Sequence, residues 1–235
     1  MNLNEVYLNS PLIEVVCELR FQRNLEIECR RNDYYGRIKE KYPNILVPYL
    51  PPGGGAPALL QYRFENVEND AGILLSIDKF SHYDKKYEGH KKFISEFLNS
   101  WKALLGTYEI QEPTRLGWRY INVIPFGREG GLVPLADFFN FQLDFPNTNG
   151  ADFENLDMTF VTRIKEGSIT TKLQTASEPK TCHEVFILDI DFGMKENLSI
   201  KNIEKNVQQA HVEARALFEK SITEKYRQYL RGEKI

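Results

Sequence analysis

A chain of 235 residues with 42% hydrophobic content is long enough to bury a core and short enough to form one domain, which we expect over residues 1–235. The net charge of −3 argues against a nucleic-acid-binding protein, because phosphate contacts usually leave a basic footprint. No run approaches the ~18 apolar residues of a membrane span, and the three cysteines lack the paired spacing of a disulfide framework. We therefore expect a cytoplasmic protein that contacts no membrane.

The first predicted element is a strand over residues 12–21, where apolar and polar side chains alternate. Its polar face carries Glu14, Glu18 and Arg20. A short helix is expected over residues 33–41, because the following proline cannot continue it.

Residues 47–57 contain a run of prolines and glycines, which predicts an exposed loop rather than a helix or strand. The run lacks the Gly-Lys-Ser/Thr ending of a phosphate-binding loop, so no nucleotide site is expected there. Two strands over residues 59–66 and 72–80 follow, and the polar turn between them predicts a hairpin. A stripe of aromatic residues then predicts an amphipathic helix over residues 90–108 that packs on the core.

The strand expected over residues 115–124 is unusually polar. One face carries Tyr120 and Asn122 beside large apolar residues, and the other face carries Arg115 and Arg119. A strand that is more polar than folding requires usually borders a groove or an interface.

The second half of the chain continues with a short helix over residues 135–141. Three strands are expected next, over residues 157–164, 168–175 and 185–192. The last element is a long helix over residues 200–230, whose apolar face includes His211.

The order of these elements suggests two related halves, at about residues 8–110 and 114–232. Each half runs strand, short helix, further strands and long helix, so each offers an apolar sheet face and an apolar helix stripe that can cover each other. We predict an α+β fold with an antiparallel curved sheet and two long amphipathic helices. A groove at the junction of the halves is the expected binding site.

Residues 9–14 read Asn-Ser-Pro-Leu-Ile-Glu, and residues 115–122 read Arg-Leu-Gly-Trp-Arg-Tyr-Ile-Asn. These stretches resemble the Asn-Ala-Pro-Leu-x-Glu opening strand and the Arg-x-Gly-Leu-Arg-Tyr-Ile-Asn central strand of a sporadically distributed bacterial family of conserved hypothetical proteins. Serine replaces the usual alanine, and Trp118 replaces leucine. The resemblance implies a single-domain bacterial protein and no particular substrate.

Asp189 and Asp191 lie two residues apart in a predicted strand, so both side chains project from one face about 7 Å apart. Paired carboxylates can hold a divalent cation or divide acid and base roles between them. This pattern would suit a metal-dependent phosphoryl-transfer or nucleic-acid-processing enzyme, with Glu14 as a further carboxylate. The favoured interpretation is a solvated sheet face or ion pairs with neighbouring arginines.

Arg119 allows two interpretations. If the strands over residues 12–21 and 115–124 pair, their glutamates and arginines form a network worth ~0.2–1 kcal/mol per pair. Alternatively, Arg119 binds a carboxylate or phosphate, for which the fork of a guanidinium is suited. The network is the favoured interpretation, and the candidate ligand-binding residues are Arg119, Asn122, Tyr120, Glu14 and Arg20.

The chain contains no nucleophile elbow, zinc-ligand spacing, Walker loop or dinucleotide fingerprint, which argues against the common enzyme classes. No cofactor is expected. His211 fits a partly buried histidine at a helix packing surface better than a catalytic base.

We therefore expect a bacterial binding protein that presents a polar groove between its halves to a small anionic ligand or a protein partner. The patchy distribution of the family suggests, by association, an accessory role in a mobile or defence system. The alternative is the metal-dependent enzyme that uses Asp189 and Asp191. A homodimer contact is a further hypothesis, because the apolar face of the last helix extends to Tyr226, Tyr229 and Leu230.

Overall fold

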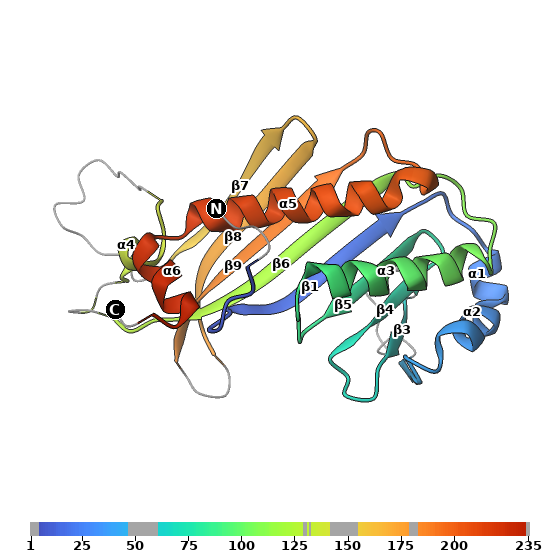
Figure 1. Ribbon diagram of the computed structural model, residues 1–235, viewed down its shortest axis with the longest axis horizontal. Helices are drawn as coiled ribbons and strands as arrows, with labels where there is room; N and C mark the ends of the chain where they lie inside the picture. Colours follow the sequence, from blue (N-terminus) through green and yellow to red (C-terminus); the bar gives the residue numbers. More distant parts are fainter. Residues whose placement is uncertain are drawn as a thin grey trace, which may run out of the picture.

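The described part of the chain forms one antiparallel sheet of nine strands, with two helices packed across one face (Figure 1). This computed structural model describes residues 5–46, 61–128, 131, 133–141, 155–178 and 183–233. In sheet order, the strands are β2 (Asn44–Leu46), β3 (Tyr62–Glu65), β4 (Ala71–Ser76), β5 (Lys79–Asp84), β1 (Leu12–Arg20), β6 (Arg115–Pro125), β9 (Glu184–Met194), β8 (Gly167–Ser177) and β7 (Asp157–Ile164). The predicted α+β class with an antiparallel sheet is therefore confirmed.

The two helices across the sheet are α3 (His90–Leu105) and α5 (Ile203–Ser221), which lie side by side and run in opposite directions (Figure 1). In α3 the buried side chains recur every three or four residues, so one stripe faces the sheet. The remaining helical segments are shorter and lie toward the ends of the sheet: α1 (Glu26–Cys29), α2 (Arg31–Ile38), α4 (Leu135–Phe138), the 3-10 turn η1 (Ile200–Asn202) and α6 (Glu224–Arg231).

The antiparallel pair β1–β6 lies at the centre of the sheet. Its register places Cys17 opposite Trp118 on the face that α3 and α5 cover, where both side chains are fully buried. The same register places Glu18 opposite Gly117 on the other face, which we call the open face. Because side chains alternate along a strand, the apolar set forms the core and the charged set stays on the open face.

From this central pair the strands follow a similar order in both directions. On one side β1 is followed by β5, β4, β3 and β2, and on the other side β6 is followed by β9, β8 and β7. In each direction, the strand beside the central pair leads along the chain into one of the two helices on the sheet. The helices α3 and α5 therefore come from opposite halves of the chain.

Aromatic rings fill the space between the sheet and α3. Trp118 of β6 packs edge-on against Phe93 of α3, with ring centroids 5.1 Å apart. Trp101 of α3 lies 5.5 Å from Phe80 of β5, and all four rings are buried. Removing a buried ring of this size typically costs about 3–5 kcal/mol, so these contacts fix α3 on the sheet.

The single strand predicted over residues 72–80 is wrong, because the stretch is a hairpin. β4 ends at Ser76, residues 77–78 form a turn, and β5 begins at Lys79. The turn sequence Ile-Asp lacks the usual Asn-Gly or Asp-Gly signal, so the alternating pattern continues across it without a break. The Ser76 hydroxyl donates to Oδ1 of Asp78 at 2.9 Å and so supports the turn. The short edge strand β2 was not predicted either.

The single helix predicted over residues 200–230 is also wrong. The chain is helical through η1 and α5, leaves the helix at Ile222 and Thr223, and resumes it in α6. Ile222 instead forms a β-bridge with Phe139. These residues are far apart in the sequence, so the break in the helix is a consequence of long-range packing. Thr223 caps α6, since its hydroxyl accepts a hydrogen bond from the Tyr226 N–H at 3.1 Å.

The end of the last helix offers less apolar surface for a dimer contact than expected. Tyr226 and Leu230 are buried against the same chain, and Tyr229 is 52% exposed. A single exposed tyrosine is a small surface on which to build a stable interface.

The exposed loop predicted over residues 47–57 falls outside the described residues, and so does Cys182. Cys17 is buried, as its place on the apolar face of β1 predicts, whereas Cys29 is exposed. Among the described residues, we find no helix that is both long and apolar enough to span a bilayer.

Two glycines provide a matched test of the backbone geometry. At Gly167 an added Cβ would lie 2.2 Å from the carbonyl oxygen of Gly193, whereas at Gly36 in α2 it would meet no atom within 4 Å. We expect Gly167→Ala to lower the free energy of unfolding by about 1–3 kcal/mol, because the backbone must shift. Gly36→Ala should raise it by about 0.5–1 kcal/mol through helix propensity.

Urea unfolding of both variants beside the wild type measures this difference. Equal stability of the two variants would contradict the close contact between β8 and β9.

Candidate functional site

The candidate ligand-binding residues lie on opposite faces of the sheet. Arg119 of β6 pairs with Asp189 on the open face, which Glu14 and Arg20 of β1 share. Tyr120 projects from the other face toward α5, and so does Asn122. Adjacent strand residues alternate between faces, so the structure does not bring these five side chains into one site.

Charged side chains of neighbouring strands pair on the open face. Glu18 accepts hydrogen bonds from Arg20 at 2.8 Å and from Arg115 at 3.1 Å. Arg115 also approaches Asp191 of β9 at 3.4 Å. The pairing of β1 with β6 therefore produces a glutamate–arginine network, and this network extends to β9.

Arg119 uses its guanidinium fork on Asp189. Its Nε donates to Oδ1 at 2.8 Å and its Nη2 donates to Oδ2 at 2.6 Å. These hydrogen bonds are the main cause that raises the pKa of Arg119 above its ordinary value. A fork engaged in this way must break an internal ion pair before it can bind an external anion.

Asp189 and Asp191 do share one face, and each lies beside an arginine. The part of the chain that the structure describes contains no group of three or more His, Cys, Asp or Glu side chains that could hold a metal ion. Burial raises the pKa of Asp191 above its ordinary value, and the nearby Arg115 opposes that shift. This geometry resembles paired ions more than a pair of metal ligands.

Asn122 ties two strands together. Its Nδ2 donates to the carbonyl of Leu188 on β9 at 3.1 Å, and the side chain is buried. With Tyr120 and Arg215, Asn122 also lines a cavity of about 10 Å³. That volume is enough for one water molecule at most.

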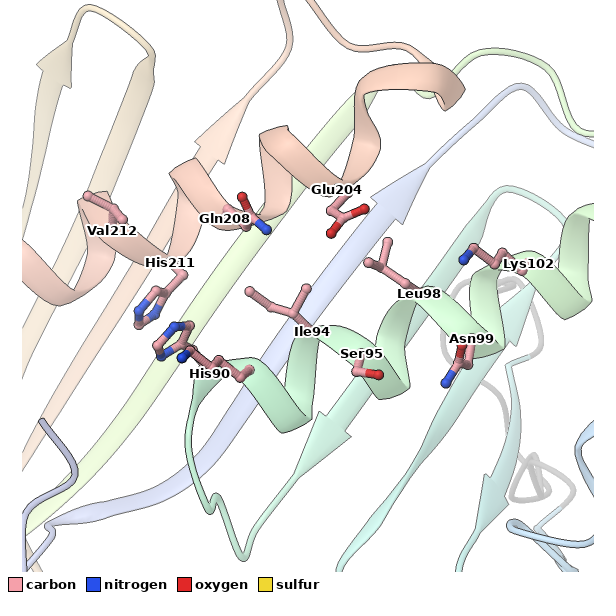
Figure 2. Close-up of a pocket in the computed structure, with 11 residues that line it drawn as sticks. His90, Ile94, Ser95, Leu98, Asn99, Lys102, Glu204, Gln208, His211 and Val212 are labelled. Carbon is pink, nitrogen blue, oxygen red and sulfur yellow. The ribbon is translucent and has the colours of Figure 1, made fainter. Parts of the chain in front are cut away.

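A groove of about 560 Å³ runs between α3 and α5 (Figure 2). Ile94 and Leu98 of α3 line its middle, and His90 and His211 lie together at one end (Figure 2). The groove therefore lies between two helices that are far apart in the sequence, α3 and α5.

The two imidazole rings at this end are stacked. Their centroids are 4.4 Å apart and their planes differ by 9°, so His90 covers one face of His211. Nδ1 of His211 shares a hydrogen bond of 2.7 Å with the hydroxyl of Tyr120, which lies 3.3 Å from the hydroxyl of Tyr87. A chain of polar groups thus leads from the groove into the core.

His211 is only 4% exposed, and one of its two ring nitrogens is satisfied. Its Nε2 has no hydrogen-bond partner among the described residues, although the ring lines the groove. Burial lowers the pKa of His211 to about 3, with smaller contributions from His90 and Arg215. The ring is therefore neutral at pH 7, and Nε2 is a donor or an acceptor according to the tautomer.

The rest of the groove is mixed in character. Asn99 and Gln208 supply hydrogen-bonding groups along its walls (Figure 2). Lys102 and Glu204 place opposite charges at the end away from the histidines, and Lys91 adds a positive charge to the lining. Such a surface suits a small ligand with a polar head and a partly apolar body.

Sequence reasoning singled out His211 and Tyr120 but did not connect them, and it did not select His90 or Tyr87. A signal was present, because His211 interrupts an apolar stripe and His90 begins an amphipathic helix. Helical spacing shows which way each ring points on its own helix. It does not show that the two helices lie against each other.

The buried histidines predict how stability depends on pH. Burial lowers the pKa of both His82 and His211 to about 3, whereas the unfolded chain titrates near 6.5. Below pH ~6.5 the unfolded state therefore binds more protons than the folded state. The free energy of unfolding has its full value above that pH and falls toward pH 3. Each ring should lower the free energy of unfolding by about 2 kcal/mol between pH 7 and pH 5.

Urea unfolding at pH 7, 6 and 5 measures this loss, and His82→Phe and His211→Phe should each flatten the dependence. An identical pH slope in the variants and the wild type would show that each ring takes up its proton at the same pH in the folded and the unfolded chain.

The Arg119–Asp189 pair predicts a modest coupling energy, since the Arg119 side chain is 46% exposed. A double-mutant cycle of Arg119→Gln and Asp189→Asn should give about 0.5–1 kcal/mol, and less in 1 M salt. Urea unfolding of the four proteins provides the measurement. A coupling of zero would contradict a stabilising ion pair between the two side chains.

Comparison of the chain with protein families, with curated protein sequences and with solved structures finds no match in any of the three. The family resemblance therefore rests on its motifs alone and remains a prediction.

Proposed function

We propose that this protein binds a small ligand in the groove between α3 and α5, with Nε2 of His211 as the hydrogen-bonding anchor. The observation that carries the proposal is a buried ring that lines a groove and leaves one nitrogen unpartnered among the described residues. An unsatisfied buried polar atom costs about 1–3 kcal/mol, so a ligand that reaches it recovers this energy. His90 would act as a cover that moves aside or stacks on the ligand.

The charges near the histidines favour a particular kind of polar head. Lys91 lines the groove, and after burial its charge is the next cause that lowers the pKa of His90. A positive potential of this kind favours an anionic or neutral head over a cationic one. The body of the ligand would lie on Ile94 and Leu98.

The strand order supports the further proposal that the groove joins two related halves. Counting outward, β1-β5-β4-β3 corresponds to β6-β9-β8-β7, and α3 corresponds to α5 as the long amphipathic helix of its half. A bacterial protein of the cytoplasm, with an accessory role in a mobile or defence system, is the setting we propose for it on the strength of the sequence resemblance.

The alternative function, a metal-dependent phosphoryl-transfer or nucleic-acid-processing enzyme, has less support. It needs Asp189 and Asp191 as free ligands, and arginines engage both carboxylates.

Ring signals of the histidines provide a direct test of the groove. The chain has four histidines, so protein labelled with ¹³C-histidine gives a short set of signals that single variants can assign. The probes are a panel of nucleoside monophosphates, dicarboxylates and aromatic carboxylates. We expect at least one probe to shift the signals of His90 and His211, while the buried His82, which does not line the groove, stays unchanged.

The matched variants separate this groove from the open face. His211→Phe keeps a ring of similar size without Nε2 and should weaken binding of that probe about tenfold, or 1.4 kcal/mol. Asp189→Asn, on the other face of the sheet, should leave binding unchanged. Equal affinity in His211→Phe, or no shift with any probe, would overturn the proposal.

A further inference from the structure

The outer edge of β7 is open to pairing with another strand. Among the described strands, β7 is the last of the sheet on its side and pairs with β8 alone. No further backbone hydrogen bond joins residues 157–164 to any other described residue. The opposite edge strand, β2, has only three residues, whereas β7 has eight.

Two of the usual protections of an edge strand, a proline and a bulge, are absent from β7. Its sequence contains no proline or lysine, and its pairing with β8 runs without a bulge. Val161 is 63% exposed. An uninterrupted edge of this length is a template for pairing with another strand, and the charges of β7, Asp157 and Arg163, lie near its two ends.

The hairpin turn determines which backbone groups point outward. Two residues, Lys165 and Glu166, connect β7 to β8, and Ile164 pairs with Gly167. In such a hairpin the pair beside the turn exchanges both backbone hydrogen bonds, and every second pair before it does the same. The outward N–H and C=O groups therefore belong to the residues between, which are Asp157, Thr159, Val161 and Arg163.

These four residues are complementary to themselves in the antiparallel direction. If Asp157 lies opposite Arg163 of a second copy, then Thr159 lies opposite Val161 of that copy, and every outward residue meets an outward residue. The two ends form opposite-charge pairs on the same face, and two β-branched side chains meet between them. Phe160 falls on the twofold axis, where Phe141 of its own chain already packs against it with ring centroids 5.8 Å apart.

The charges available at the two ends agree with this register. Arg163 forms no ion pair with a described residue, and Asp157 has only a long contact of 3.7 Å with Lys172. Both side chains are exposed and lie at opposite ends of the strand. Within the described part of a single copy, neither charge has a close ionic partner, whereas a twofold pair engages all four.

We infer that β7 pairs antiparallel with β7 of a second copy, so that the two sheets form one continuous sheet in a homodimer. This inference is independent of the ligand groove, because α3 and α5 do not contribute to the edge of β7.

Sedimentation velocity of the full chain over a range of concentrations tests the pairing. We expect a monomer–dimer equilibrium in the wild type. Arg163→Asp places two carboxylates opposite each other at both ends, and Asp157→Arg places two guanidinium groups there. Each variant alone should raise the dissociation constant at least about tenfold, which corresponds to 1.4 kcal/mol.

An equimolar mixture of Arg163→Asp with Asp157→Arg should restore the dimer, because the two carboxylates at the ends of β7 in the first variant meet two arginines of the second. Lys165→Asp makes the same charge change as Arg163→Asp but lies in the turn, so it should leave the equilibrium unchanged. A wild-type chain that stays monomeric at every concentration would overturn the inference. A dimer that these changes do not affect, or two variants that do not combine, would overturn it as well.

Discussion

The antiparallel pairing of β1 with β6 is the constraint on which the rest of the structure depends. Its register places Cys17 and Trp118 together in the core and leaves Glu18 and Arg115 on the open face. A shift of one residue would exchange the faces, so it would bury charges and expose a tryptophan. Both faces of the pair therefore favour the same register, and the remaining strands extend the sheet outward from β1 and β6.

This central pair also decides where a ligand can bind. Each long helix on the sheet follows a strand that lies beside β1 or β6, so α3 and α5 meet over the middle of the sheet. Their meeting brings His90 onto His211, and Tyr120 rises from β6 to reach the same ring. Folding alone does not require a half-satisfied imidazole at this position, and such departures from good packing tend to occur at functional sites.

The charged residues that drew attention in the sequence have a structural explanation. Asp189 of β9 lies diagonally across from Arg119 of β6, and their bidentate pair uses the groups that an anion or a metal would need. The strand over residues 115–124 and the strand of residues 157–164 were predictable, because alternation is a local property. The turn before Lys79 was not predictable, since Ile-Asp carries no turn signal. The break in the last helix at Ile222 was not predictable either, because it results from a β-bridge to Phe139, a residue far away in the sequence.

The sequence by itself determined the direction of each side chain relative to its own strand or helix. That was enough to place Trp118 in the core, Arg119 on the polar face and His211 on the packed face of its helix. Only the tertiary structure decided which distant segments became neighbours. Periodicity records the local geometry of the backbone and contains no information on strand order. The tertiary structure alone therefore places Asp189 beside Arg119, and it alone places His90 against His211.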